Sequence, residues 1–380
     1  MAFRRAGPRA LRAILSFERE RTVRLAHAFL QALGPTLTVP RRAELNPPLW
    51  EWGHLAWFEQ WWIARNPQRG AGAQADPLAV RAPSDLPSAD AWYDSSRVPH
   101  DLRWELPLPG PAATLDWLAR TRGQTLALLD ALPHDASDAE LYFFRLAAAH
   151  EAMHGEAACY MARALGVPLP AEVAARSAPP PPGAPSELHL PAQVWQLGSA
   201  GEGFCFDNEC RAHPVHLESL RIDAQPVSWS RMAEFARAGG YDGPAAWTAE
   251  GWAWRQQALP ARVEVPDSPE PAVHLSAHEA DAWCRWAGRR LPTEAEWECA
   301  ACTLPGFAWG AVWEWTASAF APYPGFEPHP YRDYSAPWFG SRRVLRGACT
   351  ATSSLLVHPR MRNFFEPSRR DIFAGFRSCA

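Results

Sequence analysis

Residues 138–165 read DAELYFFRLAAAHEAMHGEAACYMARAL and are followed by Gly166 and Pro168. Apolar side chains recur in this stretch at α-helical spacing, and glycine followed by proline is a typical helix stop. His150 and His154 are four residues apart, so they share one face of the predicted helix. The same face carries apolar side chains, namely Phe143, Leu146, Ala157 and Met161. Both imidazoles are therefore expected to point into the protein core.

Three further helices are predicted before this one, over residues 9–33, 49–65 and 114–132. Pro47 and Pro48 mark the start of the second of them. Four helices of this length predict a helical bundle. The connection over residues 67–111 is rich in Pro, Asp and Ser and shows no helical pattern. A loop of this length is often functional or covers a site.

A third histidine, His54, is predicted to face the core of the same bundle. Its helix carries an aromatic stripe on that face, formed by Trp50, Trp57, Phe58 and Trp61. Three core-facing histidines on two helices are a usual way to build a metal site inside a bundle. A lone buried histidine is more often an ordinary hydrogen-bonded core residue, and imidazole suits zinc, iron, copper and nickel alike.

The segment from His150 to His154 also has the form H-E-x-x-H. In zinc metallopeptidases two such histidines bind the metal and the glutamate is the general base, so a peptidase is an alternative. Glu59 and Glu156 are candidates to hydrogen-bond the ligand imidazoles, and solvated helix positions are the alternative for both.

The second half of the chain has a different character. Residues 171–187 read AEVAARSAPPPPGAPSE, and four consecutive prolines predict a stiff linker there. Beyond it, short apolar runs alternate with Gly, Pro and Trp, and only residues 276–287 and 294–301 have a clear helical pattern. The expected domains are residues 1–170, the linker, and residues 188–380.

The composition excludes several classes of protein. Net charge is −4 and no residue of the chain is lysine, so all 37 basic residues are arginine. No electrostatic footprint for nucleic acid or an anionic membrane is present, and no apolar run reaches the roughly 18 residues of a spanning helix. Schiff-base and P-loop lysine chemistry are impossible. The oligomeric state is not predictable from the sequence.

The Arg-rich start is best explained as a first amphipathic helix, which predicts a cytoplasmic protein whose eight cysteines are thiols. Cys299 and Cys302 form a lone C-x-x-C on a helix, for which structural thiols are expected. His274 and His278 are expected to be surface residues rather than a second metal site.

Motifs in the second half identify its fold by resemblance. They are FDNE at 206–209, GGY at 239–241, GRRLPTEAEWE at 288–298, VWEWT at 312–316 and AGFR at 374–377. Together they resemble the formylglycine-generating-enzyme/sulfatase-modifying domain, a variant of the C-type-lectin architecture. The N-terminal half resembles a DinB-type four-helix bundle. The expected fold class is therefore α+β, with a DinB-like bundle followed by a formylglycine-generating-enzyme-like domain.

This order of domains is similar to that of the hercynine oxygenases of ergothioneine biosynthesis. The resemblance implies a non-haem iron enzyme that binds Fe(II) through His54, His150 and His154. It also implies small-molecule substrates, namely hercynine, a thiol or selenosugar, and O2, with loops of the second domain closing the site. A peptidase would have no use for that second domain. A non-catalytic binding module stays an alternative that loss of a ligand histidine would support, and none is lost.

Two segments carry further roles by the same resemblance. Tyr331 in the segment YRDYS corresponds to a tyrosine that donates a proton to the oxygen species, with Tyr334 as its neighbour. The segment RNFFEPSRR at 362–370 corresponds to a substrate loop. In that loop Asn363 would help to hold hercynine, and aromatic rings suit its quaternary ammonium group. The remaining candidates for binding substrate are Phe364, Phe365, Arg369 and Arg370.

The substrate loop departs from the ergothioneine pattern. Enzymes that use γ-glutamylcysteine show R-N-W-D, and the aspartate contacts the amino group of the thiol, whereas Phe365 stands at that position here. Gly347-Ala348-Cys349-Thr350 also replaces the common Gly-Gly-Ser-Trp. In these differences, and in the segments NPPLWEWGHLAWFEQWW and YDSSRVPH, the chain resembles the selenoneine synthase branch. Enzymes of that branch join a selenosugar to hercynine. Sulfoxide formation from γ-glutamylcysteine or cysteine is the alternative.

Overall fold

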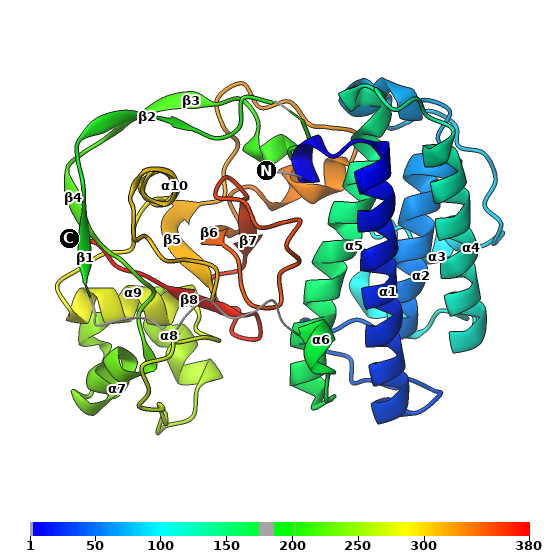
Figure 1. Cartoon of the computed structure of the whole chain (residues 1–380). Helices are drawn as coiled ribbons and strands as arrows, with labels where there is room; N and C mark the ends of the chain where they lie inside the picture. The colour runs from blue at the N-terminus through cyan, green and yellow to red at the C-terminus, as the bar shows by residue number, and fades with distance from the viewer. Residues whose placement is uncertain (1–2, 175–185, 202) are drawn as a thin grey trace.

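The computed structural model describes residues 3–174, 186–201 and 203–380, and it divides into a helical part and a mixed part (Figure 1). The long helices of the first part lie side by side and are α1 (Pro8–Leu33), α2 (Pro48–Glu59), α4 (Pro111–Asp130) and α5 (Asp138–Leu165). The four predicted helices are thus confirmed, although α2 ends earlier than expected. It continues as a single π-helical turn, Gln60–Ala64.

The ends of these helices follow from local chemistry. Ser137 accepts a hydrogen bond from the Glu140 backbone, and the Glu140 side chain bonds back to the Ser137 backbone, which forms a capping box. Gly166 ends α5 at φ 69°, a left-handed conformation that favours glycine. Proline occupies the first position of the other three helices, where a missing N–H costs nothing.

The connection between α2 and α4 contains short helical segments that the sequence pattern did not predict. They are a 3-10 helix at Arg69–Gln74, α3 (Ala89–Trp92) and a 3-10 helix at His100–Trp104. Each spans only one or two turns, which is too short to show apolar periodicity. Arg65, directly after the π-helical turn, binds Asp90 of α3 through two hydrogen bonds of 2.7 Å, so the connection packs against the bundle.

The second part is built around a small mixed sheet. Its strands run in the order β7-β6-β5-β8, with β5 parallel to β8 and the other pairs antiparallel. The strands are β5 (Trp313–Ala319), β6 (Arg343–Gly347), β7 (Asn363–Phe365) and β8 (Ala374–Phe376). Two further ribbons pair β1 (Glu187–Leu190) with β4 (Leu220–Asp223) and β2 (Gln193–Leu197) with β3 (His213–Leu217).

Helices surround this sheet, and two of them were not predicted. The predicted pair is confirmed as α9 (Ala277–Trp286) and α10 (Glu294–Thr303), whereas α7 (Trp229–Arg237) and α8 (Ala249–Ala258) are additional. Ser228 and Thr248 cap the N-termini of the two additional helices through their side chains. These caps are the sequence signal that could have identified them.

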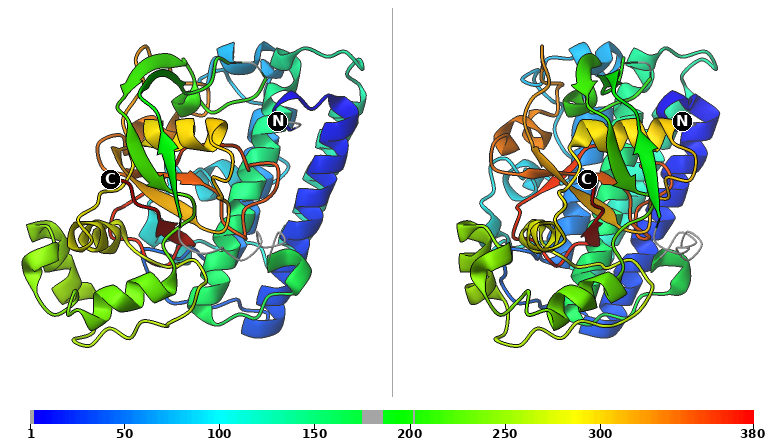
Figure 2. Two further views of the ribbon diagram at one scale, coloured as in Figure 1. Left: turned by 60° about the vertical axis from the view of Figure 1, so that its left-hand side comes forward. Right: turned by 90° about the vertical axis from the view of Figure 1, so that its left-hand side faces the viewer.

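The two parts share one hydrophobic core and meet along α5 (Figure 2). Glu156 on α5 accepts hydrogen bonds from Trp313 Nε1 at 2.7 Å and from Thr352 Oγ1 at 2.6 Å. Most of the predicted linker, residues 175–185, lies outside the described residues. Its beginning forms the short helix α6 (Ala171–Ala174).

The expectation that all eight cysteines are thiols is wrong for one pair. Cys205 and Cys210 form a disulfide, because the 3-10 helix Asp207–Glu209 turns the chain back and leaves their Cα atoms 6.6 Å apart. Cys299 and Cys302 are thiols, as expected. Among the helices in the described ranges, none has the length and apolar content needed to cross a bilayer.

Candidate metal centre

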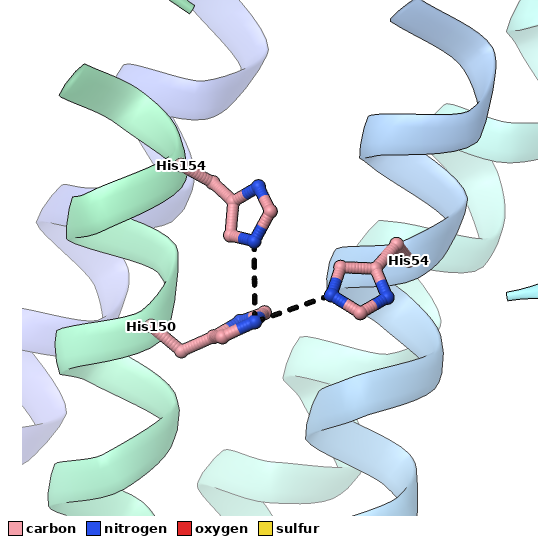
Figure 3. Close-up of side chains that lie close together, drawn as sticks. All are labelled: His54, His150 and His154. Carbon is pink, nitrogen blue, oxygen red and sulfur yellow. Dashed lines mark hydrogen bonds between the residues drawn. The ribbon is translucent and has the colours of Figure 1, made fainter. Parts of the chain in front are cut away.

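The three predicted histidines come together between α2 and α5 (Figure 3). His150 Nε2 lies 3.2 Å from His54 Nε2 and 3.2 Å from His154 Nε2. The three nitrogens all lie within 4.8 Å of one another, so one cation can contact them all. His54 and His150 are each only 2% exposed, and His154 is half-buried.

The outer nitrogens of two of these imidazoles are held by oxygen acceptors. His54 Nδ1 bonds the carbonyl of Tyr93 at 2.7 Å, and His154 Nδ1 bonds a carboxylate oxygen of Glu51 at 2.5 Å. An oxygen acceptor requires the proton to be on Nδ1, which leaves the Nε2 lone pair free for a metal. Histidine ligands in metalloproteins are normally oriented in this way. The donor set therefore fits a first-row divalent metal ion.

Gly53 explains how the Tyr93 carbonyl reaches His54. A Cβ atom at position 53 would lie 2.1 Å from Tyr93 Cε1, so any side chain there would push the tyrosine away. Tyr93 belongs to the long connection after α2 and is fully buried. The prediction that this connection covers a site is thus consistent with its contact to His54.

Arg103, in the same connection, supports two of the histidines. It donates to Asn46 Oδ1 at 2.8 Å, and Asn46 Nδ2 donates at 2.6 Å to Glu51, the partner of His154. Its guanidinium also lies 3.8 Å from the ring centre of Trp50, which stacks on His54 at 4.8 Å. The loop and the two helices therefore fix the donor geometry together.

Two of the three imidazoles, those of His54 and His150, are kept neutral by their surroundings. Burial and the neighbouring His154 lower the pKa of His54 to about 3 and that of His150 well below its usual range. Burial alone would raise the pKa of Glu51, but the hydrogen-bonded contact with His154 and the nearby Arg103 guanidinium outweigh burial and hold that pKa at about 2. Neutral imidazole is the form that binds a metal.

Glu151 of the H-E-x-x-H segment does not face the three histidines. It accepts from Arg19 Nε at 2.7 Å and Thr22 Oγ1 at 2.8 Å, and it is also paired with Arg122. A general base must reach a water on the metal, whereas this carboxylate is held in a buried ion-pair network on another face of α5. The arrangement does not support the peptidase alternative.

The predicted partners of the imidazoles also differ from the observed ones. Glu59 binds Arg19 at 2.6 Å and Arg122 at 2.9 Å, and Glu156 binds Trp313 and Thr352. Neither candidate therefore bonds a ligand histidine, and the alternative of solvated helix positions is also wrong, because both carboxylates are buried and are occupied by arginine or interface donors. Glu51, three residues before His54 and hence on the same helix face, was missed, although that spacing indicates it.

The two predicted tyrosines lie beside the histidines. Phe58 stacks on the His150 ring with their centres 3.5 Å apart, and Tyr331 meets Phe58 edge-on at 4.9 Å. The ring centre of Tyr331 is 6.0 Å from that of His150. Tyr334 stacks on Tyr331 at 5.8 Å, one ring further from the histidines. Burial raises the pKa of both phenols, so both are protonated at neutral pH.

The predicted substrate loop begins as the edge strand β7. Phe364 packs against Phe320 at 4.0 Å and meets Tyr334 at 5.5 Å, whereas Phe365 lies under the Arg369 guanidinium at 5.2 Å. The Asn363 side chain accepts from the Phe364 backbone at 2.9 Å. The structure thus brings Phe364 next to Tyr334 and groups Phe365 with Arg369.

Both predicted substrate arginines already have carboxylate partners. Arg369 binds Asp371 through Nε at 2.6 Å and Nη2 at 2.5 Å. Arg370 Nε donates to Glu279 at 2.9 Å. A paired guanidinium retains other N–H donors, but little unbalanced charge is left at either residue.

Comparison with known proteins agrees with this architecture. The Sulfatase-modifying factor enzyme 1-like domain matches residues 177–310 and 304–380. A hercynine oxygenase of Mycolicibacterium smegmatis is 32% identical, and the similarity covers 96% of each chain. The chain belongs to the hercynine oxygenase family. A second hercynine oxygenase, from Mycobacterium tuberculosis, is 32% identical over 88% of this chain and 90% of its own.

The similarity to formylglycine-generating enzymes covers only part of this chain. A formylglycine-generating enzyme of Streptomyces coelicolor is 28% identical over 42% of this chain and 77% of its own. The similarity to the hercynine oxygenases therefore extends over both the helical part and the second part of this chain. The family expected from the sequence motifs is confirmed.

Proposed function

We propose that this protein is a selenoneine synthase, an O2-dependent non-haem Fe(II) enzyme that joins the selenium of a selenosugar to the imidazole ring of hercynine. The observation that carries the proposal is the convergence of three histidine Nε2 atoms beside the half-buried side chain of Tyr331. Full-length similarity to hercynine oxygenases supports hercynine as one substrate. The proposal includes a DinB-type bundle, a domain boundary near residues 171–187 and a cytoplasmic address.

His54, His150 and His154 would hold the iron. Fe(II) would polarise the bound substrates and pass electrons to O2. The chain itself contributes dry surroundings, since Trp50, Trp57 and Phe58 are buried around the triad. Tyr331 would donate the proton of its own hydroxyl group during the reduction of O2. Phe58 packs edge-on against the tyrosine ring and fixes its position.

The trimethylammonium group of hercynine needs a site without a competing cation. Tyr334 and Phe364 meet edge-on close to Tyr331, and aromatic faces attract quaternary ammonium groups. Asn363 at the start of β7 would hold the hercynine carboxylate or imidazole through its amide. These three residues would orient the ring carbon that accepts selenium.

The second substrate is inferred from the charge of the loop. Phe365 stands where enzymes that use γ-glutamylcysteine carry an aspartate, and a phenyl ring cannot form a salt bridge with an ammonium group. Arg369 beside it is neutralised by Asp371. A loop with so little unbalanced charge suits an uncharged sugar. The second candidate, C–S bond formation with γ-glutamylcysteine or cysteine, is favoured by the names of the full-length relatives alone.

The reaction balances with O2 as the oxidant. Forming the C–Se bond breaks the ring C–H and the Se–H bonds and releases two protons and two electrons. Reduction of O2 by these two electrons gives hydrogen peroxide. If selenium loses two further electrons, the products are a selenoxide and water.

The test is a competition assay. Protein loaded anaerobically with Fe(II) receives hercynine, O2 and equal amounts of a 1-selenosugar, the matching thiosugar and γ-glutamylcysteine, and mass spectrometry identifies the adducts. We expect the selenosugar adduct to form fastest. A dominant sulfoxide of γ-glutamylcysteine would place the protein with the sulfur-transferring enzymes, and no hercynine adduct at all would refute both candidate functions.

A further inference from the structure

Residues 329–335 form a loop that carries both tyrosines, and we call it the tyrosine loop. It lies within the long connection from β5 to β6, outside the regular sheet. Its backbone hydrogen bonds are short-range, such as Arg332 N to Pro330 O at 3.0 Å and Tyr334 N to Tyr331 O at 3.4 Å. Such bonds shape the loop but do not anchor it to the rest of the molecule. Side chains from elsewhere must therefore fix its position.

The carboxylate of Asp207 holds both ends of the tyrosine loop. One oxygen accepts from the backbone N–H of His329 at 3.3 Å, and the other accepts a short hydrogen bond from Ser335 Oγ. Asp207 is 4% exposed and Ser335 is fully buried, so water does not compete for these bonds. Asn208 adds a third bond, from Nδ2 to Ser335 Oγ at 3.0 Å.

The anchor is itself tied to the rest of the molecule. The Cys205–Cys210 disulfide encloses residues 206–209, and Glu209 binds Arg4 near the N-terminus at 2.5 Å. Phe206 packs on Tyr334 with ring centres 4.3 Å apart. At the start of the tyrosine loop, His329 Nδ1 lies 3.1 Å from the hydroxyl of Tyr142, on the helix that carries His150.

We infer that Asp207 is a positioning residue that holds Tyr331 beside His150 by fixing both ends of the tyrosine loop. Because the loop has no regular secondary structure of its own beyond one 3-10 turn, releasing either end lets the phenol move away from the histidines. The expected effect of Asp207 on catalysis rests on the proposed function, whereas the anchoring of the tyrosine loop does not.

Hydrogen exchange measures the anchoring without any substrate. Asp207→Asn leaves one acceptor oxygen for two donors, the His329 N–H and the Ser335 hydroxyl, so the side chain can no longer accept from both ends of the loop. Ser335→Ala removes the hydroxyl at the second end. We expect exchange in residues 329–335 to become about tenfold faster in each variant. Asp223→Asn is the matched control, because Asp223 holds Ser378 N at 3.0 Å and Ser378 Oγ at 2.6 Å in the same manner. It should leave the tyrosine loop unchanged.

A double variant with Asp207→Asn and Tyr331→Phe distinguishes the positioning of Tyr331 by Asp207 from a general contribution of Asp207 to the fold. We expect Asp207→Asn to lower kcat about tenfold in the natural sequence with little change in KM, and less than about twofold when residue 331 is already phenylalanine. Equal losses in both backgrounds, or unchanged exchange in residues 329–335 for both loop variants, would overturn the inference. If no hercynine adduct forms with the natural sequence, the proposed function fails while hydrogen exchange still decides the anchoring.

Discussion

The histidines and the tyrosines of this site are held by different means. His54, His150 and His154 project from two regular helices. Hydrogen bonds from His154 to Glu51 and from His54 to the Tyr93 carbonyl only adjust the rotation of these two rings. Tyr331 lies on a loop whose place depends on a few side-chain contacts, chiefly those of Asp207 and Phe58. The 3.6-residue repeat of a helix sets the spacing of the donor atoms on its face, whereas a loop is held in place by contacts with residues that are distant in the sequence.

Removal of a ligand histidine should have the largest effect. His150→Ala deletes the central nitrogen of the three, so we expect loss of tight Fe(II) binding and at least a ~10³-fold fall in turnover with hercynine. Anaerobic iron titration and product mass spectrometry measure these losses. His189→Ala, on an exposed strand, should change neither. Iron binding that survives in His150→Ala would show that the metal lies elsewhere.

The tyrosine pair tests the loop side of the comparison. Tyr331 is closer to His150 than Tyr334 is, so Tyr331→Phe should lower kcat on the order of 100-fold and Tyr334→Phe much less. Fe(II) affinity should be unchanged in both variants, since neither phenol belongs to the three nitrogen donors. The reverse ranking would assign the proton donor to Tyr334.

A substitution of Glu51 tests whether the histidines on the helices also depend on a neighbouring side chain for their orientation. Glu51→Gln keeps a hydrogen-bond acceptor but removes the negative charge beside His154, and we expect Fe(II) affinity to fall about 10-fold. Glu156→Gln, a buried carboxylate on the interface with Trp313, should leave the affinity within about twofold. Equal effects of the two substitutions would mean that general helix packing, rather than orientation of His154, sets the affinity.

The sequence predicts the helical side of the site better than the loop side. The four-residue spacing of His150 and His154 places both on one helix face, and α5 begins and ends at the predicted residues. Asp207 and Arg103 could not be found in this way, because each acts on residues that are distant in the chain. The disulfide was missed although its cysteines are only five residues apart. The roles of Glu59 and Glu156 were misjudged, since periodicity shows that a residue faces inward but not which partner it meets.

Phe365 tests how far the loop sets substrate choice. Phe365→Asp restores a carboxylate at the position where enzymes that use γ-glutamylcysteine have one, so we expect selectivity to move about tenfold towards that thiol. The effect is limited because Arg369 lies 5.2 Å from residue 365 and competes for the new carboxylate. The ratio of the two adducts in the competition assay measures the shift, and Phe365→Leu controls for loss of the ring. An unchanged ratio in Phe365→Asp would remove this position from the explanation of specificity.

Glu18 should show the smallest effect, at the contact between the two parts. It lies on α1, accepts a short hydrogen bond from Ser353, and burial raises its pKa from 4.5 to about 7. The folded protein therefore keeps a proton that the unfolded chain releases near pH 4.5, so this contribution to stability is present at low pH and declines as the pH rises to about 7. Relaxation around the charged carboxylate should limit the observable loss to on the order of 1 kcal/mol.

Glu18→Gln removes this titration and keeps the acceptor for Ser353. Relative to the natural sequence, the free energy of unfolding should rise by on the order of 1 kcal/mol between pH 5 and pH 8, as measured by urea denaturation at both values. Glu20→Gln, an exposed neighbour on the same helix paired with Arg24, should show no such difference. If the free energy of unfolding changes equally with pH in the two variants, Glu18 does not titrate at the contact between the two parts.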